Sequence, residues 1–354
     1  MAGYKERVAQ DLDRWIAAGH VGADKREAIL QSIPDARRLD AAAAMAWVGA
    51  VLLGVALIAF ISANWDLMPR LARFAIVLFV YAAGAGAAAW SLQRGRPNIA
   101  NGLLTFAALA FAAAIGLTGQ IFDIVGEPRA ALYASGIAAA ALALAARASG
   151  PAIAAVLFIG ISDFMTDGLF SHRSGFGAPW LLAAAPTAGV LAVVWRSAPL
   201  AHAAALGVIA SAIWLAGRID AEAVSLLVFS AALAVLAAAG RWLRERGGAW
   251  GGVFYGWFGW AAMGFFVAAG YADHGHGLGV PHRLAWLVLA GGAVAVGRHD
   301  RHALVTAAGV LGLIGAIAAL LNDLGLDLMA AAGVFTLAAL VALAVALVVR
   351  RRAR

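Results

Sequence analysis

The chain has 354 residues, of which 64% are hydrophobic and 13% are charged, and its formal net charge is +7. A soluble domain usually has about 25% charged residues, so this composition excludes a large water-soluble core. The sequence contains no cysteine, which excludes disulfides, thiolate metal sites and cysteine nucleophiles.

The polar N-terminal segment, residues 4–33, predicts a short helical hairpin. Gly19 is placed to end the first helix, Asp24 and Glu27 have capping-box spacing for the second, and Pro34 stops it. One face of the first helix is apolar, formed by Val8, Leu12, Trp15 and Ile16. So short a segment cannot bury a core of its own. We therefore expect it to dock on the membrane domain, on a second copy of the chain in a homo-oligomer, or on a cytoplasmic partner.

Twelve apolar runs follow, and they predict an all-α, polytopic transmembrane helical bundle. In lipid only helices and closed barrels satisfy the backbone, and these continuous runs lack the alternation of barrel strands. Several runs are short for the roughly 20 residues that cross a bilayer, so ten or eleven spans remain an alternative. The runs are 43–63, 71–90, 99–119, 130–146, 151–168, 179–195, 199–216, 222–240, 249–270, 283–297, 302–321 and 328–349.

The basic residues predict the orientation of these spans. When the N-terminus is placed inside, most of the 26 Lys and Arg residues fall in inner segments, including "RWLRER" and the terminal "RRRAR". Cytoplasmic loops carry such an excess. We expect a multi-pass protein of the cell inner membrane with both termini cytoplasmic, divided into a hairpin (1–40) and a membrane domain (41–354). The positive charge is then a topology signal, not a nucleic-acid footprint.

Four stretches carry a family resemblance when they are taken in order. They are "WIAAGHVGADKREAIL", "FISANWDLMPRLARF", "GLTGQIFDIVGEP" and the terminal "NDLGLDLMAAAGVFTLAALVALAVALVVRRRAR". The order resembles the bacterial predicted membrane proteins grouped as domain of unknown function 2157, with the signature motifs over roughly residues 15–130. The resemblance implies a membrane topology and transfers no activity and no catalytic residue.

Polar residues cluster where two spans reach the outer side. If the outer ends of the first and third spans pack together, these residues line a polar vestibule, and a continued helix would place three of them on one face. The alternative is ordinary interfacial polarity, with a Trp anchor. The residues are Asn64, Trp65 and Asp66 after the first span, and Gln120, Asp123 and Glu127 after the third.

Two carboxylates, Asp163 and Asp167, share a face near the end of the run 151–168. Ionisable groups at membrane depth are costly and suggest function. Because that run is short, both carboxylates alternatively lie among the outer headgroups.

A histidine-containing loop, "YADHGHGLGVPHR", offers weak ligands for Zn²⁺ or Cu²⁺. A flexible, glycine-rich loop does not preorganise ligands, so a solvated loop is the alternative. The residues concerned are Asp273, His274, His276 and His282.

The sequence indicates function only by class. No HExxH, GxSxG with a plausible triad, or GxxxxGK[ST] motif is present, so we expect no enzyme, no catalytic residue and no cofactor. Twelve spans and an outer vestibule favour a transporter or channel-like protein for a small solute. The alternative is a non-catalytic membrane sensor or scaffold whose hairpin binds a partner.

Overall fold

The computed structural model describes residues 4–32, 68–122, 126–164, 180–272 and 278–323, together with residues 325, 332, 333, 336 and 340. The chain divides into two compact units, Met1–Pro69 and Arg70–Arg354. The expected boundary near residue 40 lies outside the described residues. Every regular element within the described ranges is helical.

The first unit contains the predicted hairpin, formed by α1 (Tyr4–Ala17), a short 3₁₀ helix η1 (Ala23–Lys25) and α2 (Arg26–Ser32). Gly19 has a left-handed φ of 74° and follows the end of α1 as expected. Leu12, on the apolar face of α1, is buried, with 1% exposure. Asp24 was expected to cap the second helix but lies inside η1, which carries the chain into α2.

One ion pair joins the two helices of the hairpin. The Arg26 Nε donates to Asp13 Oδ1 over 2.7 Å. This hydrogen bond holds the pKa of the Asp13 carboxyl below its usual value. Both side chains are exposed, so the pair contributes little to stability.

The second unit contains ten long helices in its described part, and each falls on one of the apolar runs. Eight are long and apolar enough to cross a membrane, while α7 and α8 have 16 and 14 residues. The runs 43–63 and 328–349 lie outside the described residues, apart from a few positions of the latter. The helices are α4 (Arg70–Gln93), α5 (Pro97–Ile121), α6 (Pro128–Ala146), α7 (Ser149–Phe164), α8 (Leu181–Val194), α9 (Ala198–Arg218), α10 (Ala223–Glu245), α11 (Ala249–Ala269), α12 (Gly279–His299) and α13 (Ala303–Asp323).

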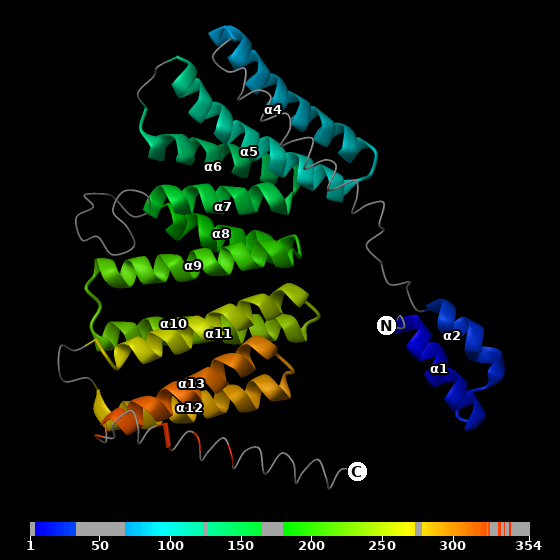
Figure 1. The fold of residues 1–354 in the computed structure, drawn as a ribbon, viewed down its shortest axis with the longest axis vertical. Helices are drawn as coiled ribbons and strands as arrows, with labels where there is room; N and C mark the ends of the chain where they lie inside the picture. The colour runs from blue at the N-terminus through cyan, green and yellow to red at the C-terminus, as the bar shows by residue number, and fades with distance from the viewer. Residues whose placement is uncertain are drawn as a thin grey trace. The chain divides into compact units, whose positions relative to one another are not determined.

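These helices form five antiparallel hairpins, α4–α5, α6–α7, α8–α9, α10–α11 and α12–α13, and each pair makes the most extensive contacts in the unit. Figure 1 places the five tight turns at one end of the helices. That end carries basic residues in every turn, among them Arg94, Arg147, Arg196, Arg246 and Arg301. We call it the basic end, and the other the opposite end.

The five tight turns share one backbone geometry. Each has a single residue with left-handed φ, namely Gly95, Arg147, Arg196, Gly247 and Arg301. The next amide donates to the carbonyl five residues before it, over 2.8 to 3.2 Å, which is the Schellman end of a helix. The turns recur roughly every 50 residues, a spacing within the range of repeat proteins.

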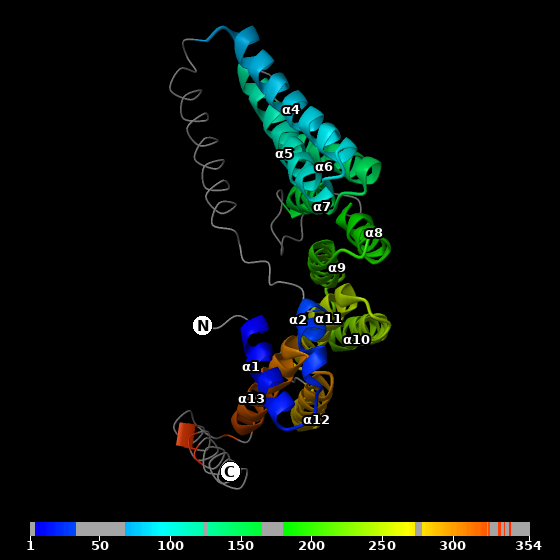
Figure 2. The ribbon, with the colours of Figure 1, turned by 90° about the vertical axis from the view of Figure 1, so that its right-hand side faces the viewer.

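Successive hairpins contact each other in chain order, and their second helices form a continuous series of contacts, although α5 contacts α6 more extensively than α7. Helix α5 contacts α7, α7 contacts α9, α9 contacts α11, and α11 contacts α13. Figure 2 views the same succession from the side. The second unit is therefore a repetitive stack of hairpins, in which each hairpin mainly touches its neighbours. The sequence predicted a bundle and did not predict this repeat.

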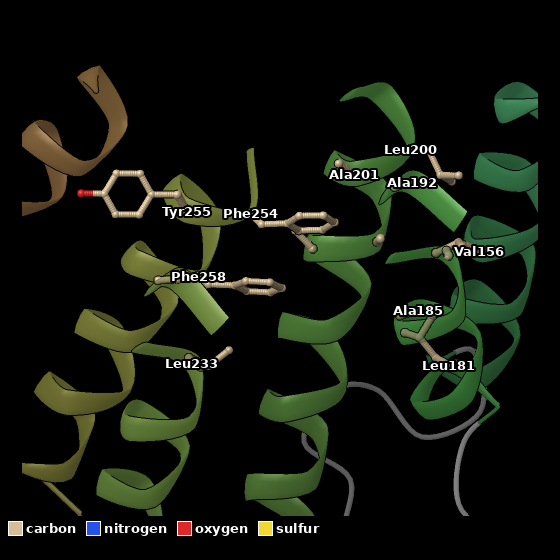
Figure 3. Close-up of a cluster of buried hydrophobic side chains, with 14 of the residues drawn as sticks. Val156, Leu181, Ala185, Ala192, Leu200, Ala201, Leu233, Phe254, Tyr255 and Phe258 are labelled. Carbon is tan, nitrogen blue, oxygen red and sulfur yellow. The ribbon is translucent and has the colours of Figure 1, made fainter. Parts of the chain in front are cut away.

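Small residues let the helices of the stack approach closely. On α9, Leu200, Ala201 and Ala205 are fully buried, and they pack against α8 and α11 in the largest apolar cluster. Figure 3 shows Phe254 and Phe258 projecting from α11 into this cluster, with stacked rings 5.7 Å apart. Close packing of small residues is the usual source of helix association in lipid.

Candidate functional site: a groove between α4, α5 and α6

Four of the predicted site residues lie in the described part of the chain: Gln120, Glu127, Asp163 and His282. The others lie outside the described residues, so nothing is stated about their structure. These are Asn64, Trp65, Asp66, Asp123, Asp167, Asp273, His274 and His276.

Gln120 and Glu127 line one groove of about 1070 Å³ at the opposite end, between α4, α5 and α6. We call it the α4–α6 groove. Its walls are mainly apolar and include Phe74, Leu78 and Leu132. Tyr81 of α4 and Phe111 of α5 face each other there, with ring centroids 5.7 Å apart.

The two polar residues reach the groove from different elements. Helix α5 ends at Ile121, and Glu127 is the extended N-cap residue that precedes Pro128 at the start of α6. A shared helix face depended on a helix that continues to residue 127, and this condition is not met. Both residues nevertheless line the same groove.

Among the described residues that line this groove, Glu127 alone is charged. The hydroxyls of Thr118 and Ser135 donate to carbonyls of their own helices over 2.7 Å, so these donors are already used. Gln120 and Glu127 are exposed. A carboxylate at the N-terminus of a helix is also stabilised by the helix dipole. The groove thus combines apolar walls with one anionic group and one amide.

Asp163 lies at the end of α7, one residue before Phe164, and not near its middle. Its carboxylate accepts hydrogen bonds from the Tyr133 hydroxyl and, over 2.7 Å, from the Leu181 amide. Beside it, Ser162 Oγ donates to the carbonyl of Arg129 over 3.0 Å. The carboxylate therefore joins α6, α7 and α8 at the opposite end.

His282 is buried in α12, with 6% exposure. Its Nε2 lies 2.9 Å from the carbonyl oxygen of Phe266, and its ring stacks on that of Phe266 at 4.5 Å. No group of three His, Cys, Asp or Glu residues that could hold a metal ion occurs in the described residues. His282 packs as a core residue between α11 and α12.

Two ion pairs, each with one buried side chain, were not identified from the sequence. Arg283 Nε lies 3.1 Å from Asp323 Oδ2, at the opposite end, and its guanidinium lies over the ring of Tyr271. At the basic end, Arg241 contacts Asp300 with Nε at 2.7 Å and Nη2 at 3.0 Å. Both pairs join residues far apart in the chain, so local patterns give no signal for them.

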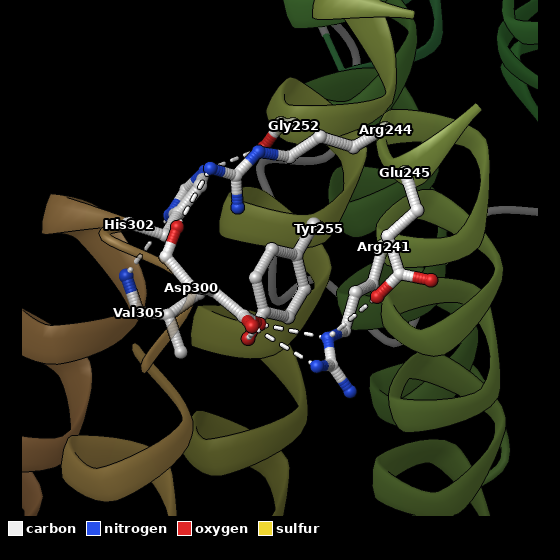
Figure 4. A network of polar contacts seen from close by, with 8 residues as sticks. All are labelled: Arg241, Arg244, Glu245, Gly252, Tyr255, Asp300, His302 and Val305. Atoms are coloured by element: carbon white, nitrogen blue, oxygen red, sulfur yellow. Dashed lines mark hydrogen bonds and ion pairs between the residues drawn. The ribbon is translucent and has the colours of Figure 1, made fainter. Parts of the chain in front are cut away.

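Asp300 is the centre of a polar network at the basic end (Figure 4). Its Oδ2 also accepts from the hydroxyl of Tyr255 over 3.0 Å, and its backbone carbonyl accepts from Arg244 Nη2 over 2.7 Å. His302 Nε2 lies 2.9 Å from the carbonyl of Gly252. The network joins the α10–α11 hairpin to the turn between α12 and α13.

The network has a defined pH dependence. Burial alone would raise the pKa of Asp300, but hydrogen bonds from Arg241 and Tyr255 and the charge of Arg241 outweigh it, so the pKa is lowered. Burial lowers the pKa of His302, and the charge of Arg244 adds to this effect. Each lowered pKa contributes stability above the unfolded value, which is lost as pH falls through the folded pKa.

We expect Asp300→Asn to lower the free energy of unfolding at neutral pH by about 1–3 kcal/mol, because charged hydrogen bonds are lost. Below about pH 6.5, the ordinary pKa of histidine, the stability of the wild type falls because His302 becomes protonated. The variant shows this loss but not the further loss from protonation of Asp300. Glu245→Gln is the control: Glu245 is exposed and lies 3.5 Å from Arg241, so its loss should cost less than about 0.5 kcal/mol. Titration from mild detergent into sodium dodecyl sulfate measures the free energy of unfolding of both variants. Equal losses would contradict the prediction.

Comparison with known families supports the resemblance noted in the sequence. Residues 13–152 match a family described as predicted membrane protein (DUF2157), so that likeness is confirmed for this part of the chain. The matched residues include every residue that lines the α4–α6 groove. Searches of curated proteins and of solved structures give no match. The chain is thus similar to a group of predicted membrane proteins without an established activity.

Proposed function

We propose that this chain is a multi-pass protein of the cell inner membrane that takes up or releases a small amphipathic cation through the α4–α6 groove. The observation that carries the proposal is the apolar, aromatic groove in which Glu127 is the one charged residue among the described lining residues. We assign the protein no enzymatic activity, no cofactor and no nucleic-acid partner.

The chemistry of the groove favours a cation with an apolar body. Apolar walls bury hydrocarbon surface at roughly 25 cal/mol per Å². The faces of Phe74, Tyr81 and Phe111 attract a cation, and the carboxylate of Glu127 supplies the opposite charge. An anionic solute would meet no positive group among the residues that line the groove.

The proposed orientation comes from the arginines of the tight turns. If the basic end faces the cytoplasm, as the positive-inside rule predicts, the groove opens to the outer side. Both termini are then cytoplasmic. Since the described helices carry no carboxylate, lysine or arginine near mid-span, we propose transport by movement between hairpins and not by a relay of charged groups through the membrane.

Binding of tetraphenylphosphonium by the purified protein in detergent tests this site. We expect Glu127→Gln to weaken binding about tenfold, the equivalent of one interaction of 1.4 kcal/mol. Glu222→Gln is the matched control, because Glu222 is the N-cap of α10 as Glu127 is the N-cap of α6. Tetraphenylborate, which has a similar shape and the opposite charge, should bind far more weakly.

Two results would overturn the assignment of this groove. One is equal binding of the cation and the anion, and the other is a loss of binding in Glu222→Gln but not in Glu127→Gln. The transport step is tested separately, by efflux of the same cation from proteoliposomes. Binding without efflux would keep the site and reject transport.

A sensor or scaffold function is the second candidate, and one observation favours it. Trp15 on α1 is 48% exposed, although it is large and apolar, and such residues are enriched where proteins bind partners. If the hairpin binds a partner, Trp15→Ala should abolish co-purification of that partner and leave cation binding unchanged.

A further inference from the structure

A second, narrower crevice runs between α10, α11 and α12. It has a volume of about 330 Å³ and mostly apolar walls, including Ala234, Ala238, Met263 and Leu289. It exists because α12 barely touches α10 or α11, while α13 makes the principal contact with α11. This crevice is separate from the α4–α6 groove and shares no lining residue with it.

The crevice has the length of one leaflet of a bilayer. Along α10 it extends from Ser230 to Arg241, and along α11 from Tyr255 to Phe266. At 1.5 Å per residue, each of these stretches is about 16 Å long. The hydrocarbon core of a bilayer is about 30 Å thick, so one extended acyl chain of a single leaflet matches the crevice.

The crevice carries a charged group at the basic end, where Arg241 lines it. Its Nε and Nη2 contact Asp300, and the side chain remains 38% exposed. Figure 4 shows its third nitrogen directed away from Asp300. The same end carries more positive than negative groups, with Arg244, Arg246, Arg298 and Arg301 beside Glu245 and Asp300.

We propose that the crevice binds an anionic phospholipid from the leaflet at the basic end. One acyl chain lies between α10 and α12, and the phosphate lies against Arg241. Charge complementarity selects the headgroup, since basic pockets between transmembrane helices on the cytoplasmic side bind anionic lipids. The apolar walls select a lipid over free phosphate.

Native mass spectrometry of the intact protein, released from detergent with added phosphatidylglycerol or phosphatidylcholine, tests this proposal. We expect phosphatidylglycerol to be retained in preference, and Ala238→Phe to reduce its binding about tenfold by filling the crevice. Ala239→Phe is the control: it is the next exposed alanine on α10, and it is not part of the crevice wall. That variant should bind as the wild type does.

The charge of the site is tested with Arg241→Gln and Arg246→Gln. Both remove one positive charge from the same end, but Arg246 lies over the ring of Trp242 and not in the crevice wall. We expect only Arg241→Gln to remove the preference for phosphatidylglycerol over phosphatidylcholine. Equal binding of both lipids by the wild type, equal effects of the two phenylalanine variants, or displacement of the lipid by inorganic phosphate alone would overturn the proposal.

Discussion

Replacing Gly309 by valine is expected to separate the α12–α13 hairpin and to lower the free energy of unfolding by about 3 kcal/mol or more, at the upper end of overpacking effects. A Cβ at this position would lie 2.5 Å from the amide nitrogen of Val294 and 2.8 Å from the carbonyl oxygen of Ala290. Both are backbone atoms of α12, so they move only if the helices move apart. Unfolding in a sodium dodecyl sulfate titration measures the loss.

Gly292→Val in the same hairpin is the control for this substitution. A Cβ at Gly292 has no atom within 4 Å, and the residue is exposed. Because valine disfavours a helix less than glycine does, this variant should stay within about 1 kcal/mol of the wild type. If Gly292→Val and Gly309→Val lose the same stability, glycine content and not helix contact would be the cause, and the prediction would fail.

The positions of the helices follow from the sequence because lipid-spanning segments must be long and continuously apolar. The runs 71–90 and 302–321, for example, correspond to α4 (Arg70–Gln93) and α13 (Ala303–Asp323). The run 283–297 was set too short, since α12 begins at Gly279 and includes His282 as well as Arg283. These polar groups are tolerated in the helix because they bond to Phe266 and Asp323.

The repeat could not be predicted, because its signal is a backbone conformation and not a residue type. The left-handed position is glycine in two tight turns and arginine in three. Arginine there costs about 1–2 kcal/mol of backbone energy, partly offset by its favourable charge at a helix C-terminus. A search for glycine alone would therefore find only two of the five turns.

The sequence singled out polar residues of the candidate site, but it did not predict which helices form its walls. Gln120 and Glu127, from the polar cluster after the run 99–119, both line the α4–α6 groove, whereas the sequence pattern suggested a vestibule shared with the first span. The apolar half of that groove comes from α4, through Phe74 and Tyr81, which sequence patterns did not connect to them. Contacts between helices depend on which faces pack, and alanine-rich faces look alike in sequence.

Asp323→Ala is expected to cost about 3 kcal/mol, because it leaves the charge of Arg283 buried without its carboxylate partner. Arg283 is 4% exposed, and its Nη1 already has no hydrogen-bond partner in the described residues. Removal of the opposite charge leaves the guanidinium beside the ring of Tyr271, without an ion-pair partner among the described residues. Glu222→Ala, an exposed acid at the same end, should cost less than about 0.5 kcal/mol.

The double variant Arg283→Met/Asp323→Leu separates the ion pair from simple packing. If the cost of Asp323→Ala arises from an uncompensated buried charge, removing both charges should restore most of the stability, since apolar pairs often replace buried ion pairs without loss. A thermodynamic cycle that includes Arg283→Met and Asp323→Leu alone gives the coupling energy, expected at about 1–3 kcal/mol for contacting residues. Costs that simply add would show that the two side chains stabilise the α12–α13 hairpin independently, and the ion-pair explanation would then be wrong.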